Sequence, residues 1–177
     1  MARTFQNIRL FSELSVIDNV KIAYNMHVTY NLVDAIIRDK KYLNEEDFIT
    51  QKAMDLLKIF HLEGEANEVA KNLPYGKQRR LEIARALATE PKLLLLDEPA
   101  AGMNPQETHE LMEMIRWIRD KFDLSILLIE HDMGLVMGVC ERIYVLEYGM
   151  KTAEGTPEEI KHNSRVIEAY LGEEVIN

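Results

Sequence analysis

The sequence has little cysteine, no long apolar run and no excess of basic charge. Cys140 is the one cysteine in 177 residues, so the chain cannot form an intrachain disulfide or a zinc site built on several cysteines. It contains no stretch of ~18 uncharged apolar residues, so we expect no membrane-spanning helix. The opening residues, MARTFQNIRLF, lack the apolar core of a secretory signal, and we therefore expect a cytosolic chain.

The charge balance disfavours a nucleic-acid-binding protein. The chain carries 21 basic and 30 acidic residues, for a net charge of −9, which opposes tracking of a phosphate backbone. Hydrophobic residues make up 47% and charged residues 29% of the chain, as in an ordinary globular protein of about one domain.

The second half of the chain shows the pattern of an α/β protein. Two apolar runs, 92–97 and 124–129, each end in acidic residues and predict buried parallel strands. Between them, 105–122 predicts a helix opened by Pro105, with an apolar stripe at Leu111, Ile115, Ile118 and Phe122. Strand, helix and strand form a βαβ unit with a right-handed crossover. Residues 142–150 and 151–154 predict two β segments that turn at Gly149, and 157–171 predicts terminal helices.

The first half of the chain is expected to be mainly helical. Apolar residues recur at helical spacing near 16–38 and 51–60. The acidic stretch 44–47 between these segments is interpreted as a helix start on a solvated face. The region 14–70 therefore predicts a helical subdomain.

The strongest chemical signal is the run Leu-Leu-Leu-Leu-Asp-Glu-Pro at 93–99. Apolar residues leading into an acid form the Walker B pattern of P-loop NTPases, in which the Asp, here Asp97, holds Mg²⁺. The adjacent Glu98 could polarise an attacking water. A buried strand whose acids only cap the next helix explains the pattern equally well when it is taken alone.

Three weaker signals accompany this run. Residues 73–87 form a turn into a helix, where Gly76 permits a close backbone approach and the helix amino terminus offers an anion site. An ordinary turn with inward-facing apolar residues is the alternative, and the basic residues Lys77, Arg79, Arg80 and Arg85 are interpreted mainly as solvated helix surface.

His131 follows the strand 124–129 and could contact a γ-phosphate, although a lone histidine is more often structural. Gln6 alone indicates nothing.

Taken together, the four signals resemble an ATP-binding cassette (ABC) ATPase in order and character. They match its Q-loop, signature helix, Walker B strand, D-loop and H-loop over essentially the whole chain. The segments Arg-Thr-Phe-Gln at 3–6, 79–86, Asp-Glu-Pro-Ala-Ala-Gly at 97–102 and Val-Ile-Glu-Ala-Tyr-Leu-Gly at 166–172 are similar to the ATP-binding subunits of branched-chain amino acid importers.

This resemblance implies a role for each matching residue. Asp97 would hold Mg²⁺ together with Gln6, Glu98 would act as general base or position the water, and His131 would contact the γ-phosphate. Gln6 would also sense the membrane subunit. Contacts with ATP bound to the opposite subunit are implied for the signature and D-loop positions, namely Leu73, Pro74, Tyr75, Gly76, Lys77, Gln78 and Asn104.

The chain departs from the family pattern in several places. Pro74 replaces a serine and has neither hydroxyl nor backbone N–H, while Tyr75 and Asn104 follow the branched-chain importers. None of the eight glycines begins G-x-x-x-x-G-K-[ST], the P-loop that supplies most of the phosphate binding. We therefore expect a chain that starts just before the Q-loop of a longer ATPase and is inactive alone.

The sequence thus predicts a partial P-loop NTPase fold of α/β class with a helical subdomain. Its parts would be a Q-loop segment (1–13), the helical subdomain (14–72), the remaining ATPase core (73–156) and carboxyl-terminal helices (157–177). Expected ligands are ATP and Mg²⁺, and expected partners are permease subunits and a second ATP-binding subunit at the inner face of the membrane. A non-hydrolysing interaction module stays open as an alternative. An ABC ATPase of DNA repair or translation is disfavoured, because long coiled coils and basic arms are absent.

Overall fold

The computed structural model describes residues 1–168, apart from the side chains of Leu32 and Val33. The chain divides into two compact units, residues 1–99 and residues 100–177. No helix in the described part of the chain is both long and apolar enough to cross a bilayer.

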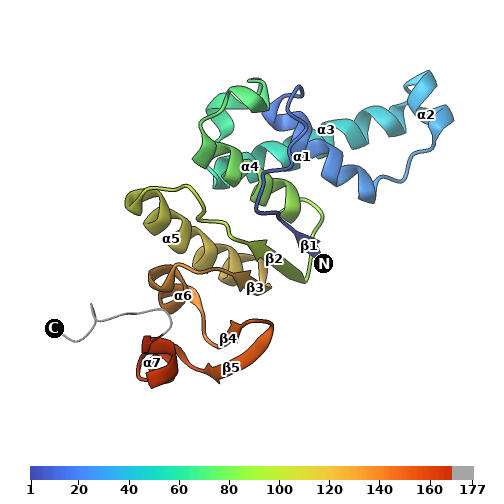
Figure 1. Ribbon diagram of the computed structural model, residues 1–177. Coiled ribbons are helices and arrows are strands. Elements are labelled where there is room, and N and C mark those ends of the chain that lie inside the picture. The colour runs from blue at the N-terminus through green and yellow to red at the C-terminus, as the bar shows by residue number, and fades with distance from the viewer. Residues whose placement is uncertain (169–177) are drawn as a thin grey trace. The chain divides into compact units, whose positions relative to one another are not determined.

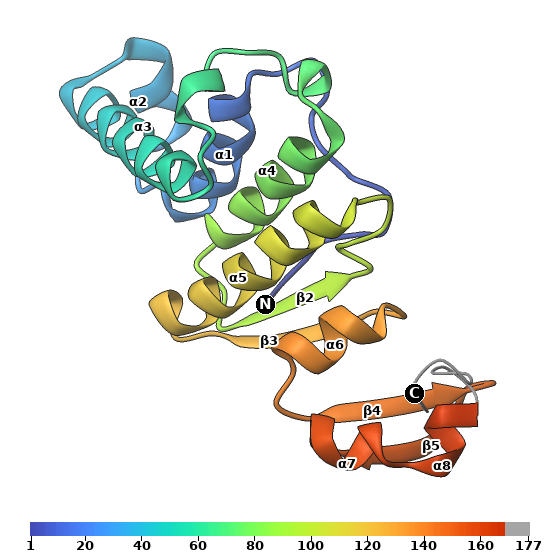
Figure 2. The same ribbon diagram turned by 90° about the vertical axis from the view of Figure 1, so that its left-hand side faces the viewer.

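The first unit joins two short parallel strands to a group of helices. Strand β1 (Ala2–Arg3) pairs with β2 (Leu93–Asp97) in the register Ala2↔Leu94. The helices are α1 (Val16–Tyr24), η1 (Asn25–His27), α2 (Leu32–Ile37), α3 (Lys40–Ile59), η2 (Glu63–Glu65), η3 (Ala70–Asn72) and α4 (Tyr75–Leu87). Figures 1 and 2 show α1 beside both α3 and α4.

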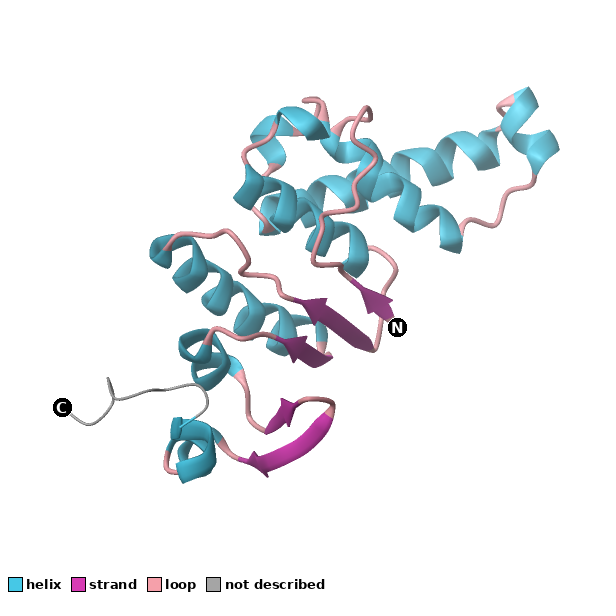
Figure 3. Ribbon diagram, in the orientation of Figure 1, coloured by secondary structure: helices cyan, strands magenta, loops and turns pink. Residues whose placement is uncertain are grey.

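The core of the first unit forms where α1, α3 and α4 meet. Val20 on α1, Leu57 on α3 and Leu81 on α4 are fully buried. Because apolar burial contributes roughly 25 cal/mol per Å², these contacts hold helices together that would be marginal alone. Figure 3 shows how strongly helix predominates between β1 and β2, as the sequence predicts for 14–70.

Two sequence predictions for this helical region are wrong in detail. The acidic stretch 44–47 lies inside α3, which begins at Lys40 because the Asp39 side chain accepts a hydrogen bond from Tyr42 N–H at 2.8 Å. The segment 16–38 is interrupted after η1, where Val28 turns to an extended backbone with ψ of 147°. At Asp39 local capping chemistry decided the boundary, and apolar spacing did not.

The second unit contains α5 (Pro105–Phe122), β3 (Ser125–Ile129), α6 (Met133–Val139), a hairpin of β4 (Ile143–Glu147) and β5 (Met150–Gly155), α7 (Pro157–Lys161) and α8 (Ser164–Val166). The predicted helix 105–122, strand 124–129 and hairpin are present, and Gly149 at the hairpin turn has φ of 77°, a value that favours glycine. Phe122 of the predicted stripe is 37% exposed, whereas its other members are buried. Predicted helix beyond residue 168 lies outside the described residues.

A small apolar core holds the carboxyl-terminal part of this unit together. Val136 from α6, Ile143 from β4, Ala153 from β5 and Ile160 from α7 bury one another, and Cys140 packs against them half-buried. Burial raises the pKa of the Cys140 thiol. A protonated, half-buried thiol packs here as a small apolar side chain.

Candidate functional site

The carboxyl end of β2 presents two adjacent acids in the first unit. Leu94 and Leu96 of this strand are buried, which anchors Asp97 at its end. The Asp97 carboxylate accepts a hydrogen bond from the Arg3 guanidinium at 2.8 Å. Glu98 has φ of 43°, an uncommon backbone conformation for a residue with a side chain, and such strain often marks functional turns.

Gln6 reaches the same place from the segment that follows β1. Its Nε2 donates to Glu98 Oε2 at 2.6 Å. Because β1 and β2 are parallel neighbours, their carboxyl ends meet at one edge of the sheet, where open α/β folds place their ligands. The structure therefore brings Gln6 together with the adjacent acids Asp97 and Glu98, although Gln6 and Glu98 lie 92 positions apart in the sequence.

The segment that carries Gln6 is held by a buried ion pair on α4. Arg79 is fully buried and Glu82 is 2% exposed, with Nη1 of the arginine 2.7 Å from Oε2 of the glutamate. The Arg79 guanidinium also donates to the carbonyls of Phe5 at 2.6 Å and Gln6 at 2.7 Å. Glu82 Oε1 accepts from Arg9 N–H at 3.1 Å.

The interpretation of Arg79 as solvated helix surface is therefore wrong. A signal for its burial was available in the sequence, because Arg79, Glu82, Ile83 and Ala86 fall on one face of α4 at helical spacing. Opposite charges three residues apart on an apolar face indicate a buried pair, since each charge needs a partner there. The pair fixes the backbone on both sides of Gln6.

The signature segment lies at the amino end of α4. The helix begins at Tyr75, so Gly76 lies in its first turn, and Pro74 takes the N-cap position without a side-chain cap. The first backbone N–H groups of a helix are left for an outside acceptor. Lys77 and Gln78 make contacts within the chain, Lys77 with Glu65 in a close ion pair and Gln78 Nε2 with the Leu73 carbonyl at 2.8 Å.

The remaining predicted site residues lie in the second unit. Asn104 caps α5 in a capping box: its side chain accepts from Glu107 N–H at 3.0 Å and Glu107 accepts from Asn104 N–H at 2.9 Å. His131 follows β3 with 72% of its side chain exposed. Its neighbour Glu130 is 1% exposed and accepts from Ala100 N–H at 2.8 Å. Glu130 thus ties the residues after the Asp-Glu-Pro motif to the end of β3, a role that the sequence does not reveal.

The acids at the end of β2 fit a magnesium ion chemically. Magnesium takes hard oxygen ligands, usually one or two carboxylates with the rest supplied by water and phosphate. Asp97 and the carbonyl oxygen of the Gln6 amide are donors of this kind. No cluster of three or more acidic, histidine or cysteine ligands occurs among residues 1–168, so a resident all-protein metal cage is absent from the described part.

Comparisons with known proteins point to one family. Residues 1–101 match the family model described as ABC transporter, and 153–176 match the model described as branched-chain amino acid ATP-binding cassette transporter. The chain is 47% identical to the high-affinity branched-chain amino acid transport ATP-binding protein LivG of Escherichia coli K12 over 173 residues. It is 43% identical to BraF of Pseudomonas aeruginosa. Both alignments cover 98% of this chain and 68% of the relative.

Solved structures show the same fold. The ADP conformation of MJ1267, an ATP-binding cassette of an ABC transporter, superposes with a TM-score of 0.75 at 28% identity, covering 97% of this chain and 68% of that one. The cbiO1 structure from Clostridium perfringens gives a TM-score of 0.76 at 26% identity, with coverages of 95% and 61%. With the family match over 1–101 and the identity to LivG, these findings establish that the chain belongs to the family of ABC transporter ATP-binding domains.

Proposed function

We propose that this chain supplies the Q-loop, signature, Walker B and H-loop parts of an ATP-binding and ATP-hydrolysing subunit of a branched-chain amino acid importer, and that it is inactive alone because its 177 residues contain no G-x-x-x-x-G-K-[ST] motif. The observation that carries the proposal is the 2.6 Å hydrogen bond from Gln6 to Glu98, beside Asp97 at the end of β2. It supports the proposal that Glu98 positions the attacking water, that Asp97 binds the metal and that the Gln6 amide links the two at one edge of the sheet. The names of LivG and BraF supply the importer class.

Each residue at this edge has a distinct proposed task. Asp97 holds Mg²⁺, which neutralises charge on the phosphates when bound. Glu98 accepts the proton of the attacking water or orients that water. Gln6 orients Glu98, and the Arg79–Glu82 pair keeps the Gln6 backbone in place. His131 is proposed to contact the γ-phosphate.

The signature segment is proposed to serve a second subunit. Its backbone N–H groups at Tyr75, Gly76 and Lys77 would face ATP held by that subunit, with Asn104 at the subunit boundary. The helical region 14–72 is proposed to receive the permease subunits at the inner face of the cell membrane. Its exposed apolar side chains support such docking, among them Met26, Ile36, Ile37 and Leu43.

Two features favour the alternative of a non-hydrolysing interaction module. The 177 residues contain no G-x-x-x-x-G-K-[ST] motif. Pro74 removes a hydroxyl and an N–H from the signature segment. Such a module would dock on its partner in the same way with and without nucleotide, so nucleotide dependence separates the two functions.

The test is association with an ATP-binding subunit that carries its own P-loop. The fluorescently labelled chain is mixed with full-length E. coli LivG, and its sedimentation is followed with MgATP, with MgADP and without nucleotide. We expect association with MgATP alone, because the signature segment needs the γ-phosphate of the partner's ATP. Gly76→Val should weaken this association about tenfold or more.

Gly64→Val is the matched control, because an added Cβ at Gly64 meets no atom within 4 Å. It should leave association unchanged. Association of equal strength with and without MgATP would favour the interaction module. No association under any condition would contradict both functions.

A further inference from the structure

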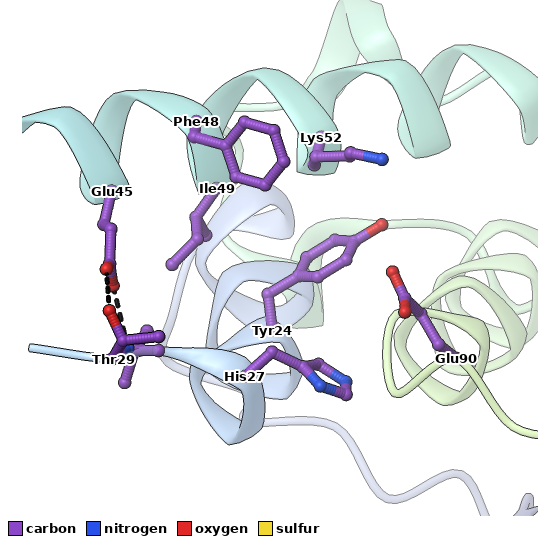
Figure 4. Close-up of a pocket in the computed structure, with 9 residues that line it drawn as sticks. Tyr24, His27, Thr29, Glu45, Phe48, Ile49, Lys52 and Glu90 are labelled. Carbon is purple, nitrogen blue, oxygen red and sulfur yellow. Dashed lines mark hydrogen bonds between the residues drawn. The ribbon is translucent and has the colours of Figure 1, made fainter.

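A cavity of about 320 Å³ opens in the helical region of the first unit, and none of the proposed ATPase residues lines it. Its walls come from the end of α1, the loop after η1, one face of α3 and the turn after α4 (Figure 4). This volume falls at the small end of the ~300–1,000 Å³ range of small-molecule sites.

One wall is fixed by hydrogen bonds. Thr29 N–H donates to Glu45 Oε2 at 2.9 Å, and the Thr29 hydroxyl donates to the other oxygen of the same carboxylate. Lys41 Nζ donates to the Thr29 carbonyl at 2.7 Å. The hydrogen bonds from Thr29 lower the pKa of Glu45. Glu45 is thus an ionised structural group that holds the loop against α3.

The neighbouring wall is apolar. Phe48 and Ile49 stand one helical turn beyond Glu45 on α3, and Val28 faces the cavity from the loop. The Phe48 side chain is 61% exposed although it borders a cavity. An aliphatic group of a ligand would gain contact here and remove part of this ring from water.

The other end of the cavity carries both signs of charge. Lys52 follows on the same face of α3, with Nζ 5.5 Å from the Phe48 ring centroid, and Glu90 enters from the turn after α4. Figure 4 shows the Tyr24 hydroxyl between the Lys52 ammonium and the Glu90 carboxylate. Burial and then the charge of Glu90 raise the pKa of Tyr24, so the phenol stays neutral. Lys52 and Glu90 are both exposed, and the charge of Lys52 also helps to lower the pKa of Asp55, one turn further along α3.

We infer that this cavity binds a free α-amino acid with an apolar side chain. Lys52 and the Tyr24 hydroxyl face its carboxylate, Glu90 faces its ammonium group, and Phe48 and Ile49 receive its side chain. A nucleotide does not suit the cavity, because Glu45 and Glu90 repel phosphate. A wholly apolar ligand would make no use of the two opposite charges, Lys52 and Glu90, that line the cavity.

The experiment is calorimetric titration of the chain with L-leucine in the absence of nucleotide. We expect saturable binding with a Kd on the order of 0.1–1 mM, as suits a small ligand with two charged contacts. Leucinamide, which lacks the carboxylate, and N-acetyl-leucine, which lacks the ammonium group, should each bind about tenfold more weakly or worse. Lys52→Met should weaken leucine about tenfold while leaving leucinamide unchanged.

Glu90→Gln should weaken leucine by a similar factor and leave N-acetyl-leucine unchanged, which a merely destabilised fold would not do. Lys58→Met and Glu63→Gln remove like charges outside the cavity lining and should bind leucine as the unaltered chain does. Absence of saturable leucine binding, or equal binding of all three compounds, would overturn the inference. Since no nucleotide or second subunit takes part, that failure would leave the proposed ATPase role untouched.

Discussion

At the scale of single residues, the Arg79–Glu82 pair organises the candidate site most strongly. Arg79 is fully buried, and the carbonyls of Phe5 and Gln6 and the carboxylate of Glu82 accept its hydrogen bonds. Desolvation of two charges is costly, and only good geometry with further hydrogen bonds offsets it. Here the acceptors of those further hydrogen bonds lie in the segment that carries Gln6. The buried pair therefore fixes the backbone of that segment.

Removing one partner of this pair should therefore damage the first unit. Arg79→Met leaves the buried Glu82 without its ion-pair partner, with the Arg9 N–H as hydrogen-bond donor and the charge of Arg85 nearby, and we expect a loss of about 3–5 kcal/mol in the free energy of unfolding. Urea denaturation followed by far-UV circular dichroism measures it. Arg142→Met removes an exposed arginine that is paired with Glu154 and should lower the free energy of unfolding far less, because water and salt screen exposed pairs. If the two substitutions lower the free energy of unfolding equally, the buried pair contributes no more to stability than the exposed one.

At the scale of secondary-structure elements, β2 and α5 are the clearest successes of sequence patterning. Leu93–Asp97 is a strand and Pro105–Phe122 a helix, as an apolar run ending in acid and a stripe at helical spacing predict. The start of α3 was not predictable from apolar spacing, because Asp39 competes successfully as N-cap. Strand β1, only two residues long, exists through its pairing with β2 and has no signal of its own.

The capping box of α5 gives Asn104 a structural task besides its proposed one at the subunit boundary. Asn104→Ala should lower the free energy of unfolding by about 1 kcal/mol, because Glu107 N–H loses its acceptor. Asn104→Asp keeps the acceptor and adds a negative charge at a helix amino terminus, so stability should be retained or rise slightly. Denaturation followed through Trp117 fluorescence reports on this helix. If the alanine variant is as stable as the parent, the capping box contributes nothing.

At the scale of the whole molecule, the sequence lacks one part of the nucleotide site. With no G-x-x-x-x-G-K-[ST] motif in its 177 residues, the chain has no phosphate cradle of the P-loop type. We predict that calorimetry of MgATP with the chain alone gives no saturable heat, and that Asp97→Asn gives none either. Clear binding that Asp97→Asn weakens would contradict this and would mean that the site is completed in another way.

The sequence by itself determined the family, most of the strands and helices, and the identity of the residues at the end of β2. These features depend on local periodicity and on motifs read along the chain. Tertiary structure alone decided that Gln6 contacts Glu98, that Arg79 donates to the carbonyls of Phe5 and Gln6, and that Tyr24, Lys52 and Glu90 share a cavity. Each of these depends on groups far apart in the chain, and their solvation and partners are set by packing, which no local pattern encodes.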